Sequence, residues 1–194
     1  KLGNFLMGRV NNSIASMIRG KSVEEAIRFA FFNHKDKFSI KAAQNYANDL
    51  YYLRTKFFAK KIVKDNAKPI NSLVRVGVNT FFKLGVKNLK NVDSFKIKNK
   101  QSAYFIFPDF VSNICDVNNK KIKNCCVELK VSNKKNRKIS RKHVLQCYNY
   151  STQSRKPVVL IYLFFEKKPI KSGIYDVNPK IFIIFNNKMK KLDL

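Results

Sequence analysis

The sequence has few acidic residues. Asp and Glu together number 12 against 40 Lys and Arg, which gives a formal net charge of +28. A net charge of about 2–8 already keeps a small domain soluble, so the excess indicates a polyanionic partner, with nucleic acid as the first candidate. A lysine- and asparagine-rich proteome would explain many lysines but not the shortage of acids. An anionic membrane surface is the second candidate.

Long hydrophobic runs are also missing. No uninterrupted apolar stretch reaches the roughly 18 residues needed to span a bilayer, and no segment sets a Trp/Leu face against a lysine face. We therefore expect no membrane partner. The N-terminus lacks the pattern of a signal peptide, so none is expected.

Cysteines are few and irregularly spaced: Cys115, Cys125, Cys126 and Cys147. Neither a disulfide framework nor a zinc knuckle has this spacing. Buried thiols in a reducing compartment are the simplest interpretation. An intracellular, cytoplasmic location follows, with nucleoid or nuclear association as a variant.

The chain does have enough apolar residues for a core, with 45% hydrophobic residues and 17 Phe in 194 residues. In the first half, Ser22-x-x-Glu25 has the form of a capping box and predicts a helix to residue 32. Ser39 predicts the start of a helix reaching about residue 62, and Pro69 one ending near Gly85. Residues 1–68 are therefore predicted to form a helical N-terminal extension.

The second half changes to short apolar runs, which predict an α/β domain over 69–194 with a basic C-terminal tail. Its helix (from residue 69), three strands, helix and strand predict a mixed sheet flanked by helices. Residues 169–179 resemble a loop, and residues 181–185 a last strand. The predicted strands lie at 92–97, 103–111, 125–131 and 157–165, and the helix that follows the third strand at 140–154.

A candidate site lies in the third of these strands. Strand periodicity puts Glu128 and Lys130 on one face, with Leu129 on the other. Asp109 lies in the preceding predicted strand, 103–111, and a hairpin could bring it opposite Glu128. An acid and a base side by side on a half-buried strand suggest a function.

The chemistry follows from these residue types. Asp109 and Glu128 supply hard oxygen ligands suited to Mg²⁺ or Mn²⁺, and the main-chain carbonyl of Leu129 could add a third. The metal would polarise a phosphate and lower the pKa of water. Lys130 would orient that water or stabilise charge that develops on phosphorus.

The acid-x-Lys triplet is a weak motif alone, because Glu166-Lys167-Lys168 repeats it. That second copy follows the helix instead of preceding it, and we interpret it as a solvated strand end. The order of the motifs is more specific, since Gln146 and Tyr150 follow one turn apart on the predicted helix.

On these residues the chain resembles the PD-(D/E)xK nuclease superfamily, whose core is helix–three strands–helix–strand. The resemblance implies a restriction-endonuclease-like fold in which Asp109 and Glu128 bind metal and Lys130 is the catalytic lysine. Gln146 and Tyr150 resemble the Gln-x-x-x-Tyr motif of the RecB-like branch. One departure is that residues 70–91 contain no acid. The cysteines lie inside the core, so no iron–sulfur cluster is expected.

The resulting hypothesis is a metal-dependent DNA nuclease, an endonuclease of restriction type that acts as a homodimer. A RecB-like exonuclease or recombination nuclease, a catalytically silent nucleic-acid-binding protein and a basic structural or membrane-surface protein are the alternatives. The N-terminal helices would supply target recognition or the dimer interface. Predicted DNA contacts are the basic residues that follow the catalytic lysine: Lys134, Lys135, Arg137, Lys138, Arg141 and Lys142.

Overall fold

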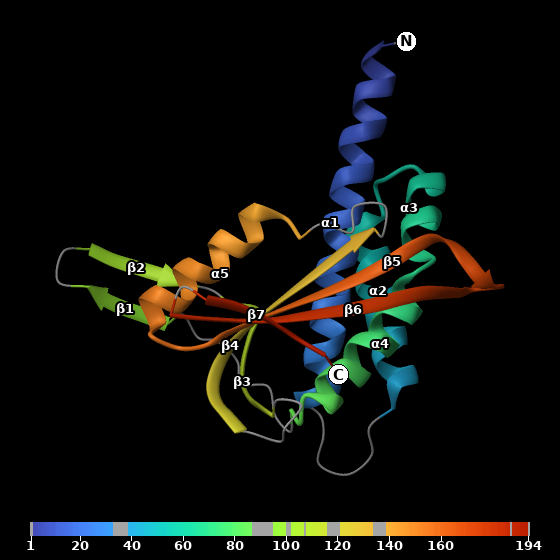
Figure 1. Ribbon diagram of the computed structural model, residues 1–194. Helices are drawn as coiled ribbons and strands as arrows, with labels where there is room; N and C mark the ends of the chain where they lie inside the picture. The colour runs from blue at the N-terminus through green and yellow to red at the C-terminus, as the bar shows by residue number, and fades with distance from the viewer. Residues whose placement is uncertain are drawn as a thin grey trace. The chain divides into compact units, whose positions relative to one another are not determined.

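The computed structural model describes residues 2–32, 39–86, 95–99, 102–106, 108–115, 121–133, 139–186 and 188–193, with the backbone alone at 2–9, 32, 95–99, 102–106 and 167. The chain forms two compact units, one of residues 1–78 and 165–177 and the other of residues 79–164 and 178–194. The predicted boundary at residue 69 falls inside the first unit. The elements are α1 (Leu2–Phe32), α2 (Ile40–Thr55), α3 (Lys60–Ala67), α4 (Ile70–Lys83), β1 (Phe95–Asn99), β2 (Ser102–Ile106), β3 (Phe110–Cys115), β4 (Lys121–Asn133), α5 (Arg141–Ser154), β5 (Val158–Lys171), β6 (Ile174–Phe185) and β7 (Lys188–Leu192) (Figure 1).

Helix α1 runs without a break through the predicted capping box, so the helix start expected at Ser22 is wrong. The reason is a buried stripe at helical spacing that continues across this point, formed by Ala15, Arg19, Ser22, Val23, Ala26, Ile27 and Ala30. This stripe favours a continuous helix over a start at Ser22.

Helices α2 and α4 begin where the sequence predicted. The Ser39 side chain accepts a hydrogen bond from the Ala42 amide at 3.3 Å and caps α2. Helix α2 ends at Thr55, however, and the separate helix α3 follows, so the prediction of one helix to residue 62 is wrong. In a single helix from Ser39 to residue 62, the apolar spacing predicts an inward-facing Phe57. It lies instead in the break between α2 and α3 and is 88% exposed.

Helix α4 begins after Pro69 and ends at a left-handed glycine, Gly85, with φ +66°. The Leu84 carbonyl accepts a hydrogen bond from the Cys115 amide at 2.7 Å. A Cβ built on Gly85 would lie 3.1 Å from the sulfur of Cys115. Glycine is therefore required here both by its backbone angle and by the close approach of β3.

The second unit contains most of a five-stranded sheet in the order β3-β4-β5-β6-β7. Strands β3 and β4 form an antiparallel hairpin, as do β6 and β7. Helix α5 connects β4 to β5, and the arrows of these neighbouring strands point the same way in Figure 1, so the sheet is mixed. The predicted α/β class is confirmed.

Several predicted strands have different bounds. The apolar run 103–111 is divided by Pro108 and Asp109 into β2 and β3, and β1 and β2 form a separate antiparallel pair. The segment 169–179, expected to be a loop, is the hairpin between β5 and β6, with Gly173 at φ +73° in its turn. The basic tail forms most of β7. The prolines suggested a loop, but both Pro169 and Pro179 lie within strands.

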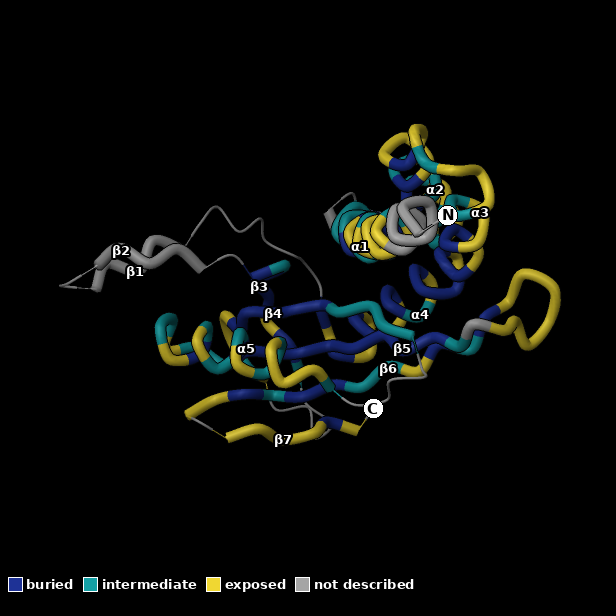
Figure 2. The backbone as a smooth tube through the Cα atoms, turned by 90° about the horizontal axis from the view of Figure 1, so that it is seen from above, coloured by how far each residue is buried: buried dark blue, intermediate teal, exposed yellow. Residues whose placement is uncertain are grey.

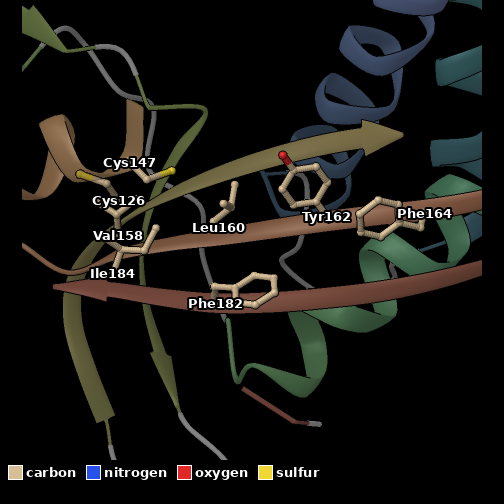
Figure 3. Packing of buried hydrophobic residues seen from close by; sticks show 8 residues of the cluster. All are labelled: Cys126, Cys147, Val158, Leu160, Tyr162, Phe164, Phe182 and Ile184. Carbon is tan, nitrogen blue, oxygen red and sulfur yellow. The ribbon is translucent and has the colours of Figure 1, made fainter. Parts of the chain in front are cut away.

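The core of the second unit is built by one face of the sheet and α5. Its members are Cys126, Cys147, Val158, Leu160, Tyr162, Phe164, Phe182 and Ile184 (Figure 3). Residues Val158–Phe165 are all buried, so both faces of β5 are covered. Figure 2 shows that the middle of the sheet is buried, whereas β7 at its edge is largely exposed. All four cysteines are free thiols, and Cys115 alone is only half-buried.

Within the described part of the chain, no helix combines the length and the apolar character that a membrane crossing requires.

Candidate functional site

The register of the β3–β4 hairpin determines where the two predicted carboxylates lie. Phe110 pairs with Val127, which places Asp109 opposite Glu128 one position further along. A register shift between Ser112 and Ile114 lies on the other side of this pair. The carboxylate of Asp109 accepts a hydrogen bond from the Leu129 amide at 2.8 Å. The hairpin therefore brings the two acids together as the sequence suggested.

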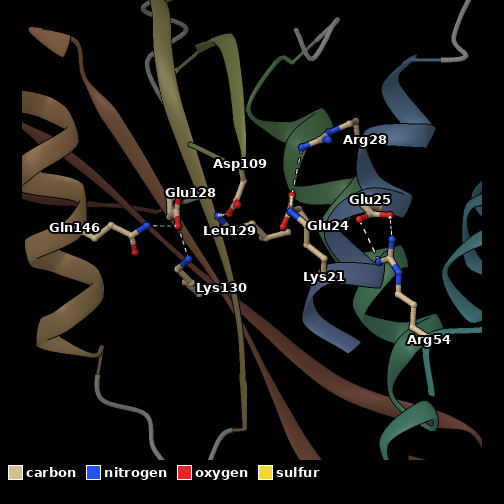
Figure 4. Close-up of polar contacts among 10 residues, drawn as sticks. All are labelled: Lys21, Glu24, Glu25, Arg28, Arg54, Asp109, Glu128, Leu129, Lys130 and Gln146. Atoms are coloured by element: carbon tan, nitrogen blue, oxygen red, sulfur yellow. Dashed lines mark hydrogen bonds and ion pairs between the residues drawn. The ribbon is translucent and has the colours of Figure 1, made fainter. Parts of the chain in front are cut away.

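Glu128 is the centre of the candidate site and is 1% exposed. Its Oε1 atom forms an ion pair with Lys130 on the same strand and accepts a hydrogen bond from Gln146 Nε2 at 3.0 Å (Figure 4). Its Oε2 atom is buried and has no hydrogen-bond partner among the described residues. A buried carboxylate oxygen without a partner is costly, so this atom marks a position suited to a cation.

The electrostatics of the site are set by burial and by crowding of charge. Burial, followed by the negative charge of Asp109, raises the pKa of Glu128 to about 7, although Lys130 acts in the opposite direction. Burial alone would lower the pKa of Lys130, but the charges of Glu128 and Asp109 outweigh it and raise that pKa. Lys130 therefore stays charged at neutral pH, whereas Glu128 has a pKa close to neutral pH.

Helix α5 supplies the next residues. Gln146 Nε2 donates hydrogen bonds to Glu128 and, at 2.8 Å, to the hydroxyl of Tyr150 one turn later. The predicted pair is thus joined by a direct hydrogen bond, and its glutamine reaches the acid on β4. Burial raises the pKa of Tyr150, so its hydroxyl keeps its proton.

Sequence reasoning missed a second polar cluster at the start of α5. In the basic run 141–143, the sequence alone suggests that His143 is exposed or in contact with phosphate. Its ring is instead half-buried, and its Nδ1 atom lies 2.5 Å from the Tyr162 hydroxyl. That hydroxyl also accepts a hydrogen bond from the Ser140 amide at 3.1 Å. Burial, with help from the charges of Lys130 and Lys142, lowers the pKa of His143 and favours the neutral ring. Spacing could have placed His143 one turn before Gln146, but nothing in the sequence pairs it with Tyr162.

The predicted DNA contacts are only partly visible. Arg141 and Lys142 lie in the first turn of α5, and both are exposed. Neither side chain forms a hydrogen bond or ion pair with any described residue. The other four, Lys134, Lys135, Arg137 and Lys138, lie outside the described residues.

The site has two carboxylates to offer a metal. Among the residues that the structure describes, no three His, Cys, Asp or Glu side chains converge on one point. Leu129, predicted to contribute its carbonyl, is seen to use its amide to hold Asp109. The described side chains that could hold a metal here are the carboxylates of Asp109 and Glu128.

No protein-family model, no curated protein and no solved structure matches the chain.

Proposed function

We propose that the chain is a metal-dependent nuclease that hydrolyses phosphodiester bonds of DNA at the Asp109–Glu128–Lys130 site. The observation that carries the proposal is the surroundings of Glu128: a buried carboxylate beside a second acid, in contact with one lysine, and with one oxygen that has no described partner. A perturbed acid of this kind is typical of functional sites.

The residues suit a Mg²⁺ or Mn²⁺ ion. Mg²⁺ keeps several of its waters and is commonly held by one or two carboxylates together with substrate phosphates. Two acids are therefore enough, and Glu128 Oε2 is the oxygen most in need of a cation. When bound, such an ion supplies charge that polarises the phosphate and favours ionised water.

The chain's own residues would have distinct tasks. The Leu129 amide fixes the Asp109 carboxylate. Lys130, charged at neutral pH, would stabilise negative charge that develops at phosphorus. Gln146 holds the orientation of Glu128 and is itself fixed through Tyr150. The wider excess of positive charge would attract the DNA backbone.

The same site fits two kinds of nuclease. A restriction-type endonuclease with a restriction-endonuclease-like core is the first, and a homodimer is part of that proposal. The hydrogen bond from Gln146 to Glu128 favours the second, a RecB-like end-processing or recombination nuclease, because it gives the Gln-x-x-x-Tyr pair a role at the acid.

Cleavage of circular single-stranded, circular duplex and linear duplex DNA with Mg²⁺ or Mn²⁺ tests the proposal. We expect metal-dependent cutting that is lost in Asp109→Ala and in Lys130→Ala. Discrete fragments from circular duplex DNA would favour the restriction type, and progressive loss of linear DNA the RecB-like type.

Asp65→Ala is a matched control, because this exposed acid of the first unit already pairs with Lys68 at 2.6 Å. It should cut like the wild type. DNA binding without cleavage on any substrate would contradict the nuclease proposal and leave a binding protein in its place.

A further inference from the structure

One face of α5 borders a hollow that shares Gln146 with the candidate site. It has a volume of about 480 Å³, is open to solvent, and is lined by Arg141, Lys142, Leu145, Gln146, Asn149 and Tyr150. Small-molecule sites commonly have volumes of about 300–1,000 Å³, so the hollow could hold one nucleotide. Gln146 belongs both to this hollow and to the hydrogen bonds of Glu128.

The lining divides into an apolar part and a charged part. Most of the lining is apolar, and Leu145 within it is 51% exposed. Exposed leucines are common on surfaces, but this one lies beside the half-buried Tyr150 in a recess. An apolar recess with an aromatic ring suits the flat face of a nucleic-acid base.

The polar groups of the hollow are available for a ligand. The side chains of Arg141, Lys142 and Asn149 make no hydrogen bond or ion pair with any described residue. The two cations would contact phosphates, and the Asn149 amide can both donate to and accept from the edge of a base. The residues span positions 141 to 150, about 13 Å along the helix at 1.5 Å per residue.

We infer that this hollow binds one unpaired nucleotide of the nucleic acid next to the phosphodiester at Glu128, with its base against Leu145 and Tyr150 and its phosphates on Arg141 and Lys142. A paired base in a duplex hides its faces by stacking, so the ligand is a single strand or a nucleotide turned out of a duplex. The inference rests on the proposed function for its choice of nucleic acid as the ligand.

The test compares a short single-stranded oligodeoxynucleotide with an abasic oligomer of the same length and charge, by fluorescence anisotropy with a chelator present. The wild type should bind the base-containing strand about 5- to 150-fold more tightly, because contacts between a base and a side chain contribute about 1–3 kcal/mol. The double substitution Leu145→Ala and Asn149→Ala should remove most of this difference while leaving affinity for the abasic oligomer unchanged.

Leu53→Ala is the matched control, since Leu53 is another exposed helical leucine, at 64%, and lies in α2. It should retain the full difference. Equal wild-type affinity for both strands, or a difference that survives the double substitution, would overturn the inference. Base-dependent binding without metal-dependent cleavage would contradict only the nuclease proposal, and cleavage that needs Asp109 without base-dependent binding would contradict only the hollow's role.

Discussion

Two glutamates of the first unit differ from Glu128 of the second unit in the charges around them. In the first unit Glu24 has two cations close to it, with Lys21 at 2.6 Å and Arg28 at 3.3 Å. The Glu25 carboxylate accepts hydrogen bonds from the two terminal guanidinium nitrogens of Arg54, at 3.1 and 3.0 Å.

In the second unit Glu128 lies beside another acid, and Lys130 is its one ion-pair partner among the described residues. The first arrangement neutralises its acids, whereas the second leaves negative charge that a cation could satisfy. In so basic a chain, the notable acid is the one that has too few positive charges around it.

Among the substitutions that test this difference, the largest effect is expected on DNA cleavage. Glu128→Gln should lower metal-dependent DNA cleavage about 1,000-fold or more, because loss of a metal ligand removes several kcal/mol of transition-state stabilisation. Glu25→Gln, the matched change in the first unit, should leave cleavage unchanged. Equal losses in a quantitative nicking assay would remove the distinction between the two acids.

The next effect concerns Arg19, a buried cation in the first unit without an acid as hydrogen-bond partner among the described residues. Arg19 is 7% exposed, and its described polar partner is Asn66, whose Oδ1 lies 2.8 Å from the guanidinium. Burial lowers the pKa of Arg19 to about 10, which leaves it charged at neutral pH. Its guanidinium also lies over the ring of Phe165.

Asn66→Leu should therefore lower the free energy of unfolding by about 2–4 kcal/mol in urea titrations, because a buried charge loses its hydrogen-bond acceptor. Arg19→Met, which removes the charge itself, should cost less. A larger loss for Arg19→Met would show that the charge is stabilising in its own right.

A smaller effect is the pH dependence of stability. The pKa of Glu128 is about 7 in the folded chain against an ordinary 4.5, so between these values the folded state holds the proton more tightly than the unfolded state. The free energy of unfolding should therefore fall as pH rises from about 5 to about 8, by about 1–3 kcal/mol relative to Glu128→Gln. Thermal melts with a chelator measure this.

Adding Mg²⁺ at the higher pH should recover part of the loss in the wild type and none in the variant. A wild-type curve parallel to that of Glu128→Gln would contradict the burial of an ionisable carboxylate.

The smallest expected effect is at the exposed pair of the first unit. Arg54→Gln should lower the free energy of unfolding by about 0.2–1 kcal/mol, since ion pairs near the surface are screened by water. The effect should shrink in high salt. A loss as large as that of Asn66→Leu would mean that the two kinds of contact are not distinct.

Several features of both units were predictable from local signals. Helix α5, the start of α4 after Pro69 and its end at Gly85 follow from residue types whose backbone preferences are strong. The approach of Asp109 to Glu128 followed from the alternation of one hairpin. These features depend on neighbours in the sequence, which is why the sequence reveals them.

Other features depend on partners far along the chain. The hydrogen bond of Asp109 to the Leu129 amide needs the exact register, and the contact of His143 with Tyr162 joins residues from different elements. Helix α1 was missed before Ser22 because its buried residues become a stripe only against α2 and α3. The hairpin of β5 and β6 was mistaken for a loop because of Pro169, Gly173 and Pro179.

The hairpin of β5 and β6 affects how the protein responds to proteolysis and to truncation. The chain passes between the two units at Val78–Asn79, returns at Phe164–Phe165 and leaves again at Val177–Asn178. The returning segment is held in the first unit by hydrogen bonding of the Tyr175 amide to Ser72 at 3.0 Å. A single proteolytic cut, or a deletion of the N-terminal helices, would therefore not release a self-contained half. It would strip the covering from Phe165 and Tyr175, so the helical segment is a covalently interleaved part of the molecule and not a detachable accessory.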